Sequence, residues 1–319
     1  MMTLAEPKAE MESSGDTPPA ALPNFIMVGA PKCGTTAMFR YLSAHPEVFM
    51  SDPKEPMYFN YMGDGSGSDE ATYVTNWTEY RNLFSGAAGK AAIGEASTWY
   101  LYSPAAAKRI HDRLPDAKII AFLRQPVDRA WSLYNFNIQR RKGELATFEE
   151  ELAREPEFVE KRSSWERHYL GFGRYGEQLE RYYTLFPREN IRVYLMDEIQ
   201  ADSVAVARDL LQFIGVDPSF AKDAVKGANV TFVPKNKAIH KFFGNQGLRA
   251  LTAKILPEAI KRRIRKVERD NMTRPPKLDP ALREKLTRPF HDDFRKIEEL
   301  TGKDLSAWYA KDSAGAAKG

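Results

Sequence analysis

The segment FIMVGAPKCGTTAMFRYLSA, residues 25–44, constrains the fold of this chain more than any other. The apolar run FIMVG predicts a buried strand, and residues 35–44 have the pattern of a helix. A short loop with a glycine at position 34 connects them. A strand that passes through such a loop directly into a helix is typical of α/β proteins, whose ligands bind at the carboxyl ends of parallel strands. The segment therefore predicts an α/β domain that begins near residue 24.

Further apolar runs predict three more buried strands, AAIGEAS (91–97), KIIAFLR (118–124) and IRVYLMDEI (191–199). Helical patterns lie between these runs and after the last of them, at residues 104–113, 126–140, 175–186 and 203–214. Strands that alternate with helices favour right-handed β-α-β units in a mostly parallel sheet. We expect a P-loop-like, three-layer α/β domain over most of residues 24–235, with a central sheet flanked by helices.

Two other regions have their own patterns. Residues 60–80 are irregular and rich in Gly and Ser, which predicts a surface loop. From about residue 238 the pattern is helical and charged. The last helix should pack on the core, because four apolar residues recur there at helical spacing, namely Phe290, Phe294, Ile297 and Leu300.

The two ends of the chain carry no such pattern. Residues 1–23 contain charges, Pro, Ser and Gly without an apolar block, and residues 311–319 are mostly small. We expect both to be disordered tails of a single domain, residues 24–310. Residues 1–23 do not resemble a secretory signal peptide, and no stretch approaches the roughly 18 apolar residues of a membrane span. The sequence therefore predicts a soluble, cytoplasmic protein.

Composition narrows the class of ligand. With 43% hydrophobic and 12% aromatic residues, the 319-residue chain can bury a sizeable core. Its net charge of +4 suits an anionic small ligand but is too weak to indicate nucleic acid. Cys33 is the only cysteine, which excludes an internal disulfide framework and a cysteine-based metal cluster.

The loop GAPKCGTT, residues 29–36, nearly has the frame of a nucleotide-binding P-loop, G-x-x-x-x-G-K-[ST]. Thr35 occupies the lysine slot, and Lys32 lies three residues earlier. A strand, a glycine loop and a helix N-terminus together favour a bound phosphate, and the Thr35 and Thr36 hydroxyls can cap the helix and add donors. The alternative is a strand-to-helix turn in which Gly34 only supplies unusual backbone angles.

A second candidate is KIIAFLRQPVDRAWSLYNF, residues 118–136. Its strand ends on Arg124, and Ser132 lies about one turn into the next helix, with Arg129 nearby. An arginine at a strand's carboxyl end and a hydroxyl on the following helix suit a second phosphate. Alternatively, Arg124 caps the helix or pairs with Asp128.

A third candidate is SDPKEPMYFN, residues 51–60, in which two prolines hold Lys54 and Glu55 on an extended turn. Held in a desolvated pocket that raises its pKa, Glu55 could act as a general base on a hydroxyl. The alternative is a Lys–Glu pair solvated on a loop.

Together these segments resemble the sulfotransferases that use 3′-phosphoadenosine 5′-phosphosulfate (PAPS), in particular the carbohydrate branch with the heparan-sulfate enzymes and their bacterial relatives. PKCGTT resembles the family's 5′-phosphosulfate loop, LRQPVDRAWSLY its 3′-phosphate motif, and KEPMYF its substrate-side segment. IGEASTWYL and GRYGEQLERYYTLFPRENIRVYLMDEI resemble two further family segments, so the resemblance covers roughly residues 24–240.

The resemblance implies roles for individual residues. Lys32 would contact the phosphosulfate and stabilise the leaving phosphate, and the loop residues Cys33, Gly34, Thr35 and Thr36 would hold the 5′-phosphate. Arg124 and Ser132 would hold the 3′-phosphate. Glu55 would take the proton from the acceptor as it attacks sulfur in line. No metal is expected, because sulfuryl transfer needs no divalent ion bridging β- and γ-phosphates.

Several assignments are less direct. The nearest candidate for the family's third cofactor loop is residues 231–243, with Lys235 and Lys237. Glu95 could orient the acceptor or be the buried partner of a Lys or Arg, and His168 lies beside the expected acceptor cleft. Cys33 could have a pKa lowered by the helix N-terminus, or it could be a small filler residue.

This sequence also departs from the family in two places. Ala96 replaces a lysine that many relatives carry, and Trp99 stands where a proline is usual.

The expected acceptor is a hydroxyl, or an amine, of a carbohydrate or glycolipid, read by residues 60–80 and 140–175. Alternatives are a sulfotransferase acting on a non-sugar metabolite, a P-loop kinase using Mg-ATP, and a non-catalytic binding protein that uses the basic cluster KRRIRK, residues 261–266. That cluster would also allow peripheral contact with anionic lipid. The sequence does not indicate an oligomeric state.

Overall fold

Five parallel strands form one sheet in the order β2-β3-β1-β4-β5. The computed structural model describes residues 21–60, 73–140, 146–161, 163–223, 233–234 and 271–309. The strands are β1 (Phe25–Gly29), β2 (Val48–Met50), β3 (Ala92–Ala96), β4 (Lys118–Leu123) and β5 (Ile191–Leu195). The chain goes from β1 outward to β2, returns to β3, and crosses to the other side of β1 for β4 and β5. Ligands of such sheets bind at this reversal of strand order.

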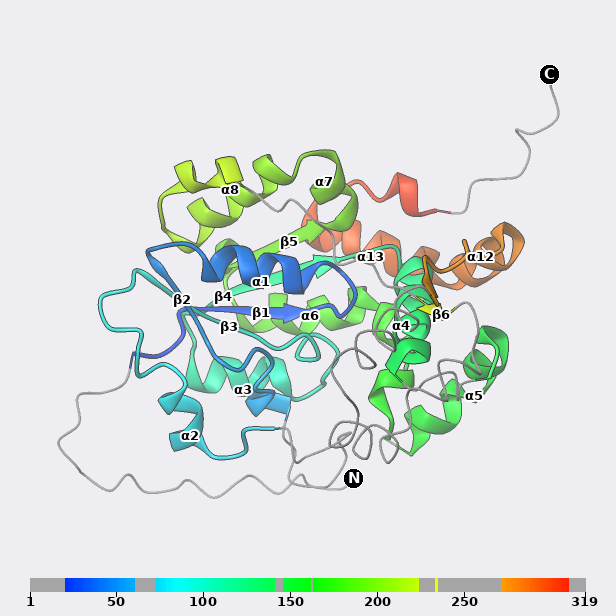
Figure 1. Cartoon of the computed structure of the whole chain (residues 1–319), viewed down its shortest axis with the longest axis horizontal. Helices are drawn as coiled ribbons and strands as arrows, with labels where there is room; N and C mark the ends of the chain where they lie inside the picture. Colours follow the sequence, from blue (N-terminus) through cyan, green and yellow to red (C-terminus); the bar gives the residue numbers. More distant parts are fainter. Residues whose placement is uncertain are drawn as a thin grey trace, which may run out of the picture.

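Helices cover both faces of the sheet, which confirms the three-layer α/β fold. They include α1 (Thr35–Ser43), α3 (Ala106–Arg113), α4 (Pro126–Arg140), α6 (Tyr175–Leu185) and α8 (Ser203–Ile214). Figure 1 shows α1 and α8 on one side of the sheet and α3 on the other, with α4 beyond the end toward which the strands point. The predicted helices begin and end within two residues of the observed ones.

The central strand is entirely buried because it has a neighbour on each edge and helices on each face. Phe25, Ile26, Met27 and Val28 are all 0% exposed. Glycine is required at position 94 on β3, since a Cβ there would overlap the Phe25 ring. Burial of this apolar strand anchors the loop that follows it.

The C-terminal part contains α12 (Pro280–Thr287) and α13 (His291–Thr301). The predicted docking of the last helix is confirmed: α13 packs on α6, and Phe290, Phe294 and Ile297 are buried, with Leu300 partly buried against the same core. A short antiparallel pair, β6 (Val233–Pro234) with β7 (Met272–Thr273), lies near α4.

Besides the pair β6–β7, which was not predicted, the structure differs from the sequence prediction in four places. The short strand β2 was not predicted, and the strand predicted at 191–199 ends at Leu195. There α7 (Met196–Ala201) begins, because the Glu198 carboxylate accepts a hydrogen bond of 2.8 Å from the Leu195 N–H and caps the helix. The region 60–80, expected to be irregular, contains the start of α2 (Trp77–Asn82), which the Asn76 side chain caps. Residues 61–72 are outside the described part.

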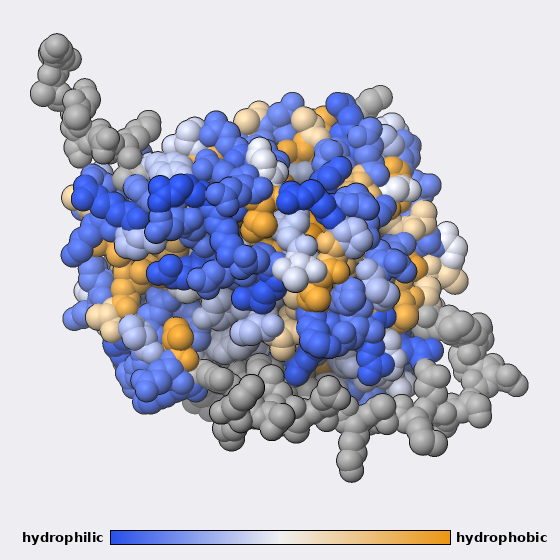
Figure 2. All heavy atoms as spheres, turned by 180° about the vertical axis from the view of Figure 1, so that it is seen from behind, coloured by the Kyte–Doolittle hydropathy of each residue, from blue (hydrophilic) through white to orange (hydrophobic). Residues whose placement is uncertain are grey.

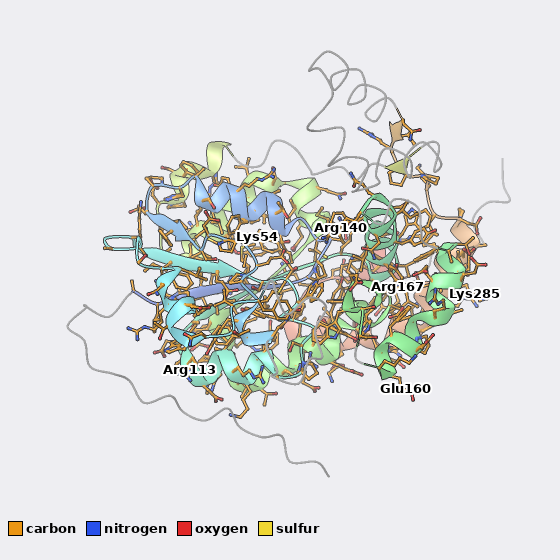
Figure 3. The ribbon with its side chains drawn as sticks, turned by 60° about the horizontal axis from the view of Figure 1, so that its bottom comes forward. Lys54, Arg113, Arg140, Glu160, Arg167 and Lys285 are labelled. Atoms are coloured by element: carbon orange, nitrogen blue, oxygen red, sulfur yellow. The ribbon has the colours of Figure 1, made fainter. Side chains whose placement is uncertain are left out.

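The fourth difference is α5 (Phe148–Glu160), which has a capping box formed by Thr147 and Glu150. Its Glu151 is fully buried and ion-pairs with Arg167, with 2.8 Å between Oε2 and Nε. Figure 3 shows Arg167 on the inner side of α5 and Glu160, at the end of the helix, turned outward. The pair fixes α5 to the segment 163–173, which borders the cavity described below.

The surface is mainly hydrophilic. Among the described residues the only strongly exposed large apolar side chain is Val159, at 43%. The face in Figure 2 has scattered apolar residues between many hydrophilic ones. No helix in the described ranges is long and apolar enough to cross a membrane.

Candidate active site

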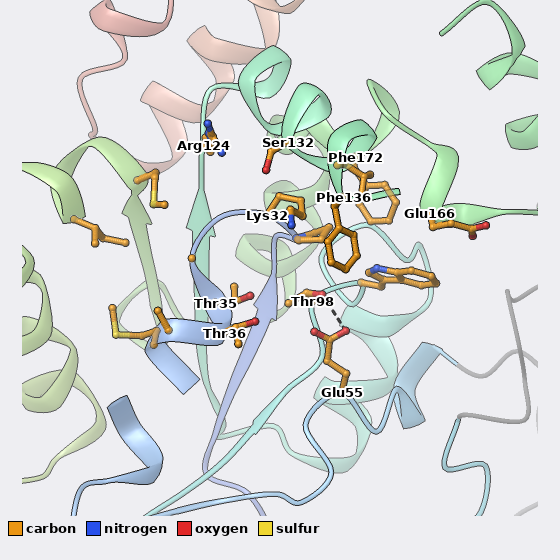
Figure 4. Close-up of a pocket in the computed structure, with 18 of the residues that line it drawn as sticks. Lys32, Thr35, Thr36, Glu55, Thr98, Arg124, Ser132, Phe136, Glu166 and Phe172 are labelled. Atoms are coloured by element: carbon orange, nitrogen blue, oxygen red, sulfur yellow. Dashed lines mark hydrogen bonds between the residues drawn. The ribbon is translucent and has the colours of Figure 1, made fainter. Parts of the chain in front are cut away.

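A cavity of about 810 Å³ lies at the carboxyl ends of β1 and β4. It brings together side chains from six separate segments, within residues 31–38, 55, 98–99, 124–140, 166–172 and 196–203. Seven of the residues singled out from the sequence line it, namely Lys32, Gly34, Thr35, Thr36, Glu55, Arg124 and Ser132. Figure 4 shows Arg124 and Glu55 on opposite sides of the cavity with Lys32 between them. The cavity thus holds three candidate motifs that are far apart in the sequence.

The loop after β1 is shaped by left-handed backbone. Gly34 has φ 84° and is the N-cap of α1, and Lys32 has φ 70°. The first N–H groups of a helix have no intrahelical acceptor, so the start of α1 offers donors to a bound anion. No side-chain hydrogen bond caps α1. The expectation that Thr35 and Thr36 cap the helix is therefore wrong, because both lie inside it.

Lys32 is a partly buried cation close to other cations. Burial, followed by the charge of Arg124, lowers its pKa to about 8. Its ammonium lies 4.0 Å from the centroid of the Phe136 ring, and among the described residues no carboxylate forms an ion pair with it. A bound anion would replace the missing counter-charge and raise the pKa again.

Arg124 is also available to a ligand. Its alternative partner, Asp128, is bound by Arg283 of α12, with contacts of 2.9 and 3.0 Å. Within the described part of the chain no ion pair involves Arg124, and Figure 4 shows Ser132 beside it on α4. The alternative pairing of Arg124 with Asp128 is therefore excluded.

Arg129 is on α4, the same helix as Ser132, but it is 0% exposed and does not line the cavity. It donates to the carbonyl of Tyr169 and lies 5.4 Å from the centroid of the Phe172 ring. Its charge also lowers the pKa of Lys32. Arg129 therefore strengthens the positive potential of the cavity without lining it.

Glu55 lies on the far side of the cavity. One carboxylate oxygen accepts a 3.3 Å hydrogen bond from the Thr98 hydroxyl, and the other pairs with Lys54. The Glu55 side chain is 31% exposed, so it is less desolvated than the sequence argument assumed. Its own backbone has φ 64°, a conformation that is unfavourable for residues other than glycine. Such strain is often found where a side chain must be aimed at a ligand.

Aromatic residues to which the sequence assigned no role in the site complete the lining near Glu55. They are Trp99, Phe136 and Phe172, and Glu166 lies at the same side. Trp99 packs against Trp165 and Phe172, with ring centroids 5.8 and 6.1 Å away. These rings come from three segments, so only the fold brings them together.

Three predicted residues do not line the cavity. Cys33 is 0% exposed, and its thiol lies 3.9 Å from the Tyr175 hydroxyl. Burial raises the pKa of Cys33, which is opposite to the lowering expected from the helix N-terminus. The side chain is therefore a buried filler residue, although the loop backbone around it borders the cavity.

His168 is 2% exposed and both of its ring nitrogens are occupied. Nδ1 lies 2.9 Å from the Tyr102 hydroxyl and Nε2 lies 2.9 Å from the Ser163 carbonyl. Burial lowers its pKa. His168 therefore does not line the cavity, and its ring holds protein groups together instead.

Glu95 on β3 is 0% exposed and does not line the cavity. Its carboxylate accepts hydrogen bonds from the hydroxyls of Tyr80 (2.7 Å) and Tyr100 (3.3 Å). The partners of Glu95 in the core are therefore tyrosine hydroxyls, and no ion pair with a Lys or Arg is seen among the described residues. Lys235, Lys237 and the cluster 261–266 lie outside the described residues.

Known proteins resemble this chain. A family model described as "Sulfotransferase domain" matches residues 22–272. The crystal structure of a sulfotransferase from Alicyclobacillus acidocaldarius superposes with a TM-score of 0.69 at 32% identity, covering 90% of this chain and 99% of that one.

Two curated relatives are much longer than this chain. Membrane-associated sulfotransferase kil1 of Dictyostelium discoideum is 39% identical over 119 residues, which is 37% of this chain and 24% of the relative. Human bifunctional heparan sulfate N-deacetylase/N-sulfotransferase 3 is 28% identical over 210 residues, 62% of this chain and 23% of the relative. The chain thus spans about a quarter of the length of these relatives.

Proposed function

The chain belongs to the sulfotransferase family, and we propose that it transfers a sulfuryl group from PAPS to a hydroxyl, or an amine, of a carbohydrate or glycolipid. The observation that carries the proposal is that Lys32 and Arg124 line one cavity without a carboxylate partner among the described residues. Two uncompensated cations beside the start of a helix favour a ligand with several negative charges.

The cavity residues fit the two phosphate-bearing ends of such a donor. Gly34, Thr35 and Thr36 lie at the start of α1 and would hold the 5′-phosphosulfate. Arg124 and Ser132, at the end of β4 and on α4, would hold the 3′-phosphate. An arginine there would favour this nucleotide over ATP, which has no 3′-phosphate.

Glu55 and Lys32 would perform the chemistry. Glu55 takes the proton of the acceptor hydroxyl while the acceptor oxygen forms a bond to sulfur. The bond between sulfur and the bridging phosphate oxygen breaks, and adenosine 3′,5′-bisphosphate leaves. Lys32 stabilises the negative charge that develops on that oxygen. The products are a sulfate ester and the bisphosphate.

The lining near Glu55 supports a ring-bearing acceptor. Trp99 and Phe172 offer flat apolar surfaces beside the carboxylate, and sugar rings can pack their apolar faces on such surfaces. The name of the human relative includes heparan sulfate, which also supports a carbohydrate acceptor.

A P-loop kinase is the second candidate function, because residues 29–36 nearly match the P-loop pattern. Its lysine slot holds Thr35, which argues against a triphosphate ligand. Among the described residues no group of three or more His, Cys, Asp or Glu could hold a metal ion.

Incubation with ³⁵S-labelled PAPS and a panel of neutral and anionic glycans tests the proposal. We expect a labelled sulfate ester from the wild-type protein in the presence of a chelator. Transfer of ³²P from Mg-ATP, with no transfer from PAPS, would favour the kinase.

A further inference from the structure

The segment that carries Glu55 is strained. Glu55 and Met57 have φ values of 64° and 58°, both in the left-handed region. Residues other than glycine stay in this region only when surrounding contacts hold them there. The contacts that hold residues 55–59 therefore determine where the Glu55 carboxylate points.

Three backbone N–H groups of this segment donate to β3 and the turn after it. Glu55 donates to the Ala96 carbonyl at 2.9 Å. Met57 donates to the Ser97 hydroxyl at 3.0 Å, and Phe59 donates to the Tyr100 hydroxyl at 3.2 Å. Two of the three acceptors are side-chain hydroxyls, which rotate unless their own protons are engaged.

Glu95 binds both of these hydroxyls, those of Ser97 and Tyr100. Tyr100 is fully buried and donates its hydroxyl proton to Glu95, which leaves its lone pairs to accept from Phe59. Tyr80 of α2 donates to the same carboxylate oxygen at 2.7 Å, and its ring stacks on Tyr58 and packs edge-on against Phe59. Both tyrosines thus bind Glu95, but Tyr100 in addition accepts a hydrogen bond from a backbone N–H of the strained segment.

We propose that Glu95 is a positioning residue for the transfer reaction: through the Tyr100 hydroxyl it fixes the backbone of residues 55–59 and so the direction of the Glu55 carboxylate. The inference rests on the proposed function of Glu55. It assigns a role to a buried acid that contacts neither cation nor ligand. A shift of a general base by a fraction of an ångström is enough to slow proton transfer.

Keeping a carboxyl at this position has a cost in stability. Burial raises the pKa of Glu95 to about 7, against the hydrogen bonds from Ser97, Tyr80 and Tyr100. An acid with a raised folded-state pKa stabilises the fold least above that pKa, because it must be ionised while buried. Glu95→Gln should therefore melt at the same or a higher temperature than the wild type at pH 8.

The test compares four variants by turnover and by hydrogen exchange of the peptide containing residues 55–59. We expect Glu95→Ala and Tyr100→Phe to lower kcat by about tenfold or more, with KM for PAPS unchanged, and to speed exchange of this peptide. Tyr80→Phe is the matched control, since it loses an equivalent bond to Glu95 and keeps its ring packing on Tyr58. It should leave kcat and exchange near the wild-type values. Glu95→Gln keeps an acceptor for Tyr100 and should rescue most of the turnover.

The proposal is overturned if Tyr80→Phe and Tyr100→Phe change kcat and exchange equally, or if Tyr100→Phe changes neither. Hydrogen exchange also separates this proposal from the proposed function. If the wild type formed no sulfate ester from PAPS, the function would be wrong, and the exchange data would still decide whether Glu95 holds the segment.

Discussion

The two walls of the cavity are built in different ways. The donor wall, made of Lys32, Thr35, Thr36, Arg124 and Ser132, is cationic and lies on the loop after β1, the start of α1, the end of β4 and the second turn of α4. The acceptor wall, made of Glu55, Thr98, Trp99 and Phe172, lies on loops and short turns and presents a carboxylate and aromatic rings. Under the proposed function, the first wall binds the anionic donor and the second positions the acceptor hydroxyl. The predictions below probe each wall in turn.

Glu55→Gln should give the largest effect, a loss of about 10²-fold or more in kcat, because the amide cannot accept the acceptor's proton. The affinity for adenosine 3′,5′-bisphosphate should be unchanged, since Glu55 lies on the acceptor wall. Steady-state kinetics and calorimetry check the two halves of this prediction. Glu157→Gln, on the exposed side of α5, is the control and should behave as wild type. Normal turnover of Glu55→Gln would require another base.

Arg124→Ala should weaken binding of adenosine 3′,5′-bisphosphate by about 10- to 100-fold, because a charge-assisted contact is lost. Binding of adenosine 5′-phosphosulfate, which lacks the 3′-phosphate, should change much less. Arg113→Ala, in the last turn of α3 and absent from the cavity lining, is the matched control. An equal loss for both nucleotides would place Arg124 elsewhere on the ligand.

The lowered pKa of Lys32 makes donor binding depend on pH. Below about pH 8 the Lys32 ammonium is charged, and the affinity for the bisphosphate is retained. Above about pH 8 most of the Lys32 amine is neutral, so that binding of the anion requires the uptake of a proton. We expect the Kd for adenosine 3′,5′-bisphosphate to rise by up to about tenfold per pH unit above 8. Calorimetry between pH 7 and 9.5 measures this, and Lys32→Ala should bind weakly without that dependence. A pH-independent Kd in the wild type would show that Lys32 does not meet the anion.

Trp99→Ala should give the smallest effect, a rise of about three- to tenfold in the KM of the acceptor with KM for PAPS unchanged, because one stacking surface is removed. Trp99→Phe should recover part of the loss. If the KM values for donor and acceptor rose together, the ring would support the whole cavity and not the acceptor wall alone.

The donor wall could be predicted because its residues lie in two short segments, each of which passes from a strand through a turn into a helix. A strand, a loop and a helix start place Lys32, Gly34 and Thr36 at one point whatever the rest of the chain does. Arg124 and Ser132 follow the same rule on β4 and α4. Glu55 was found by its motif, and the structure places it across the cavity from Arg124.

The acceptor wall could not be predicted in the same way. Trp99, Phe136 and Phe172 meet only through tertiary packing and have no spacing that marks them. Cys33, Glu95 and His168 are close in sequence to residues of the cavity and were therefore proposed as site residues. Their side chains are buried in the core and do not line the cavity. One missed element did carry a signal, because the Thr147–Glu150 capping box precedes α5, a helix with an internal proline and many acidic residues.

Calorimetry of the purified wild-type protein with adenosine 3′,5′-bisphosphate, compared with Mg-ATP under the same conditions, tests the central claim most directly. The account predicts saturable binding of the bisphosphate without added metal and much weaker binding of Mg-ATP. Binding of Mg-ATP with no heat from the bisphosphate would contradict it.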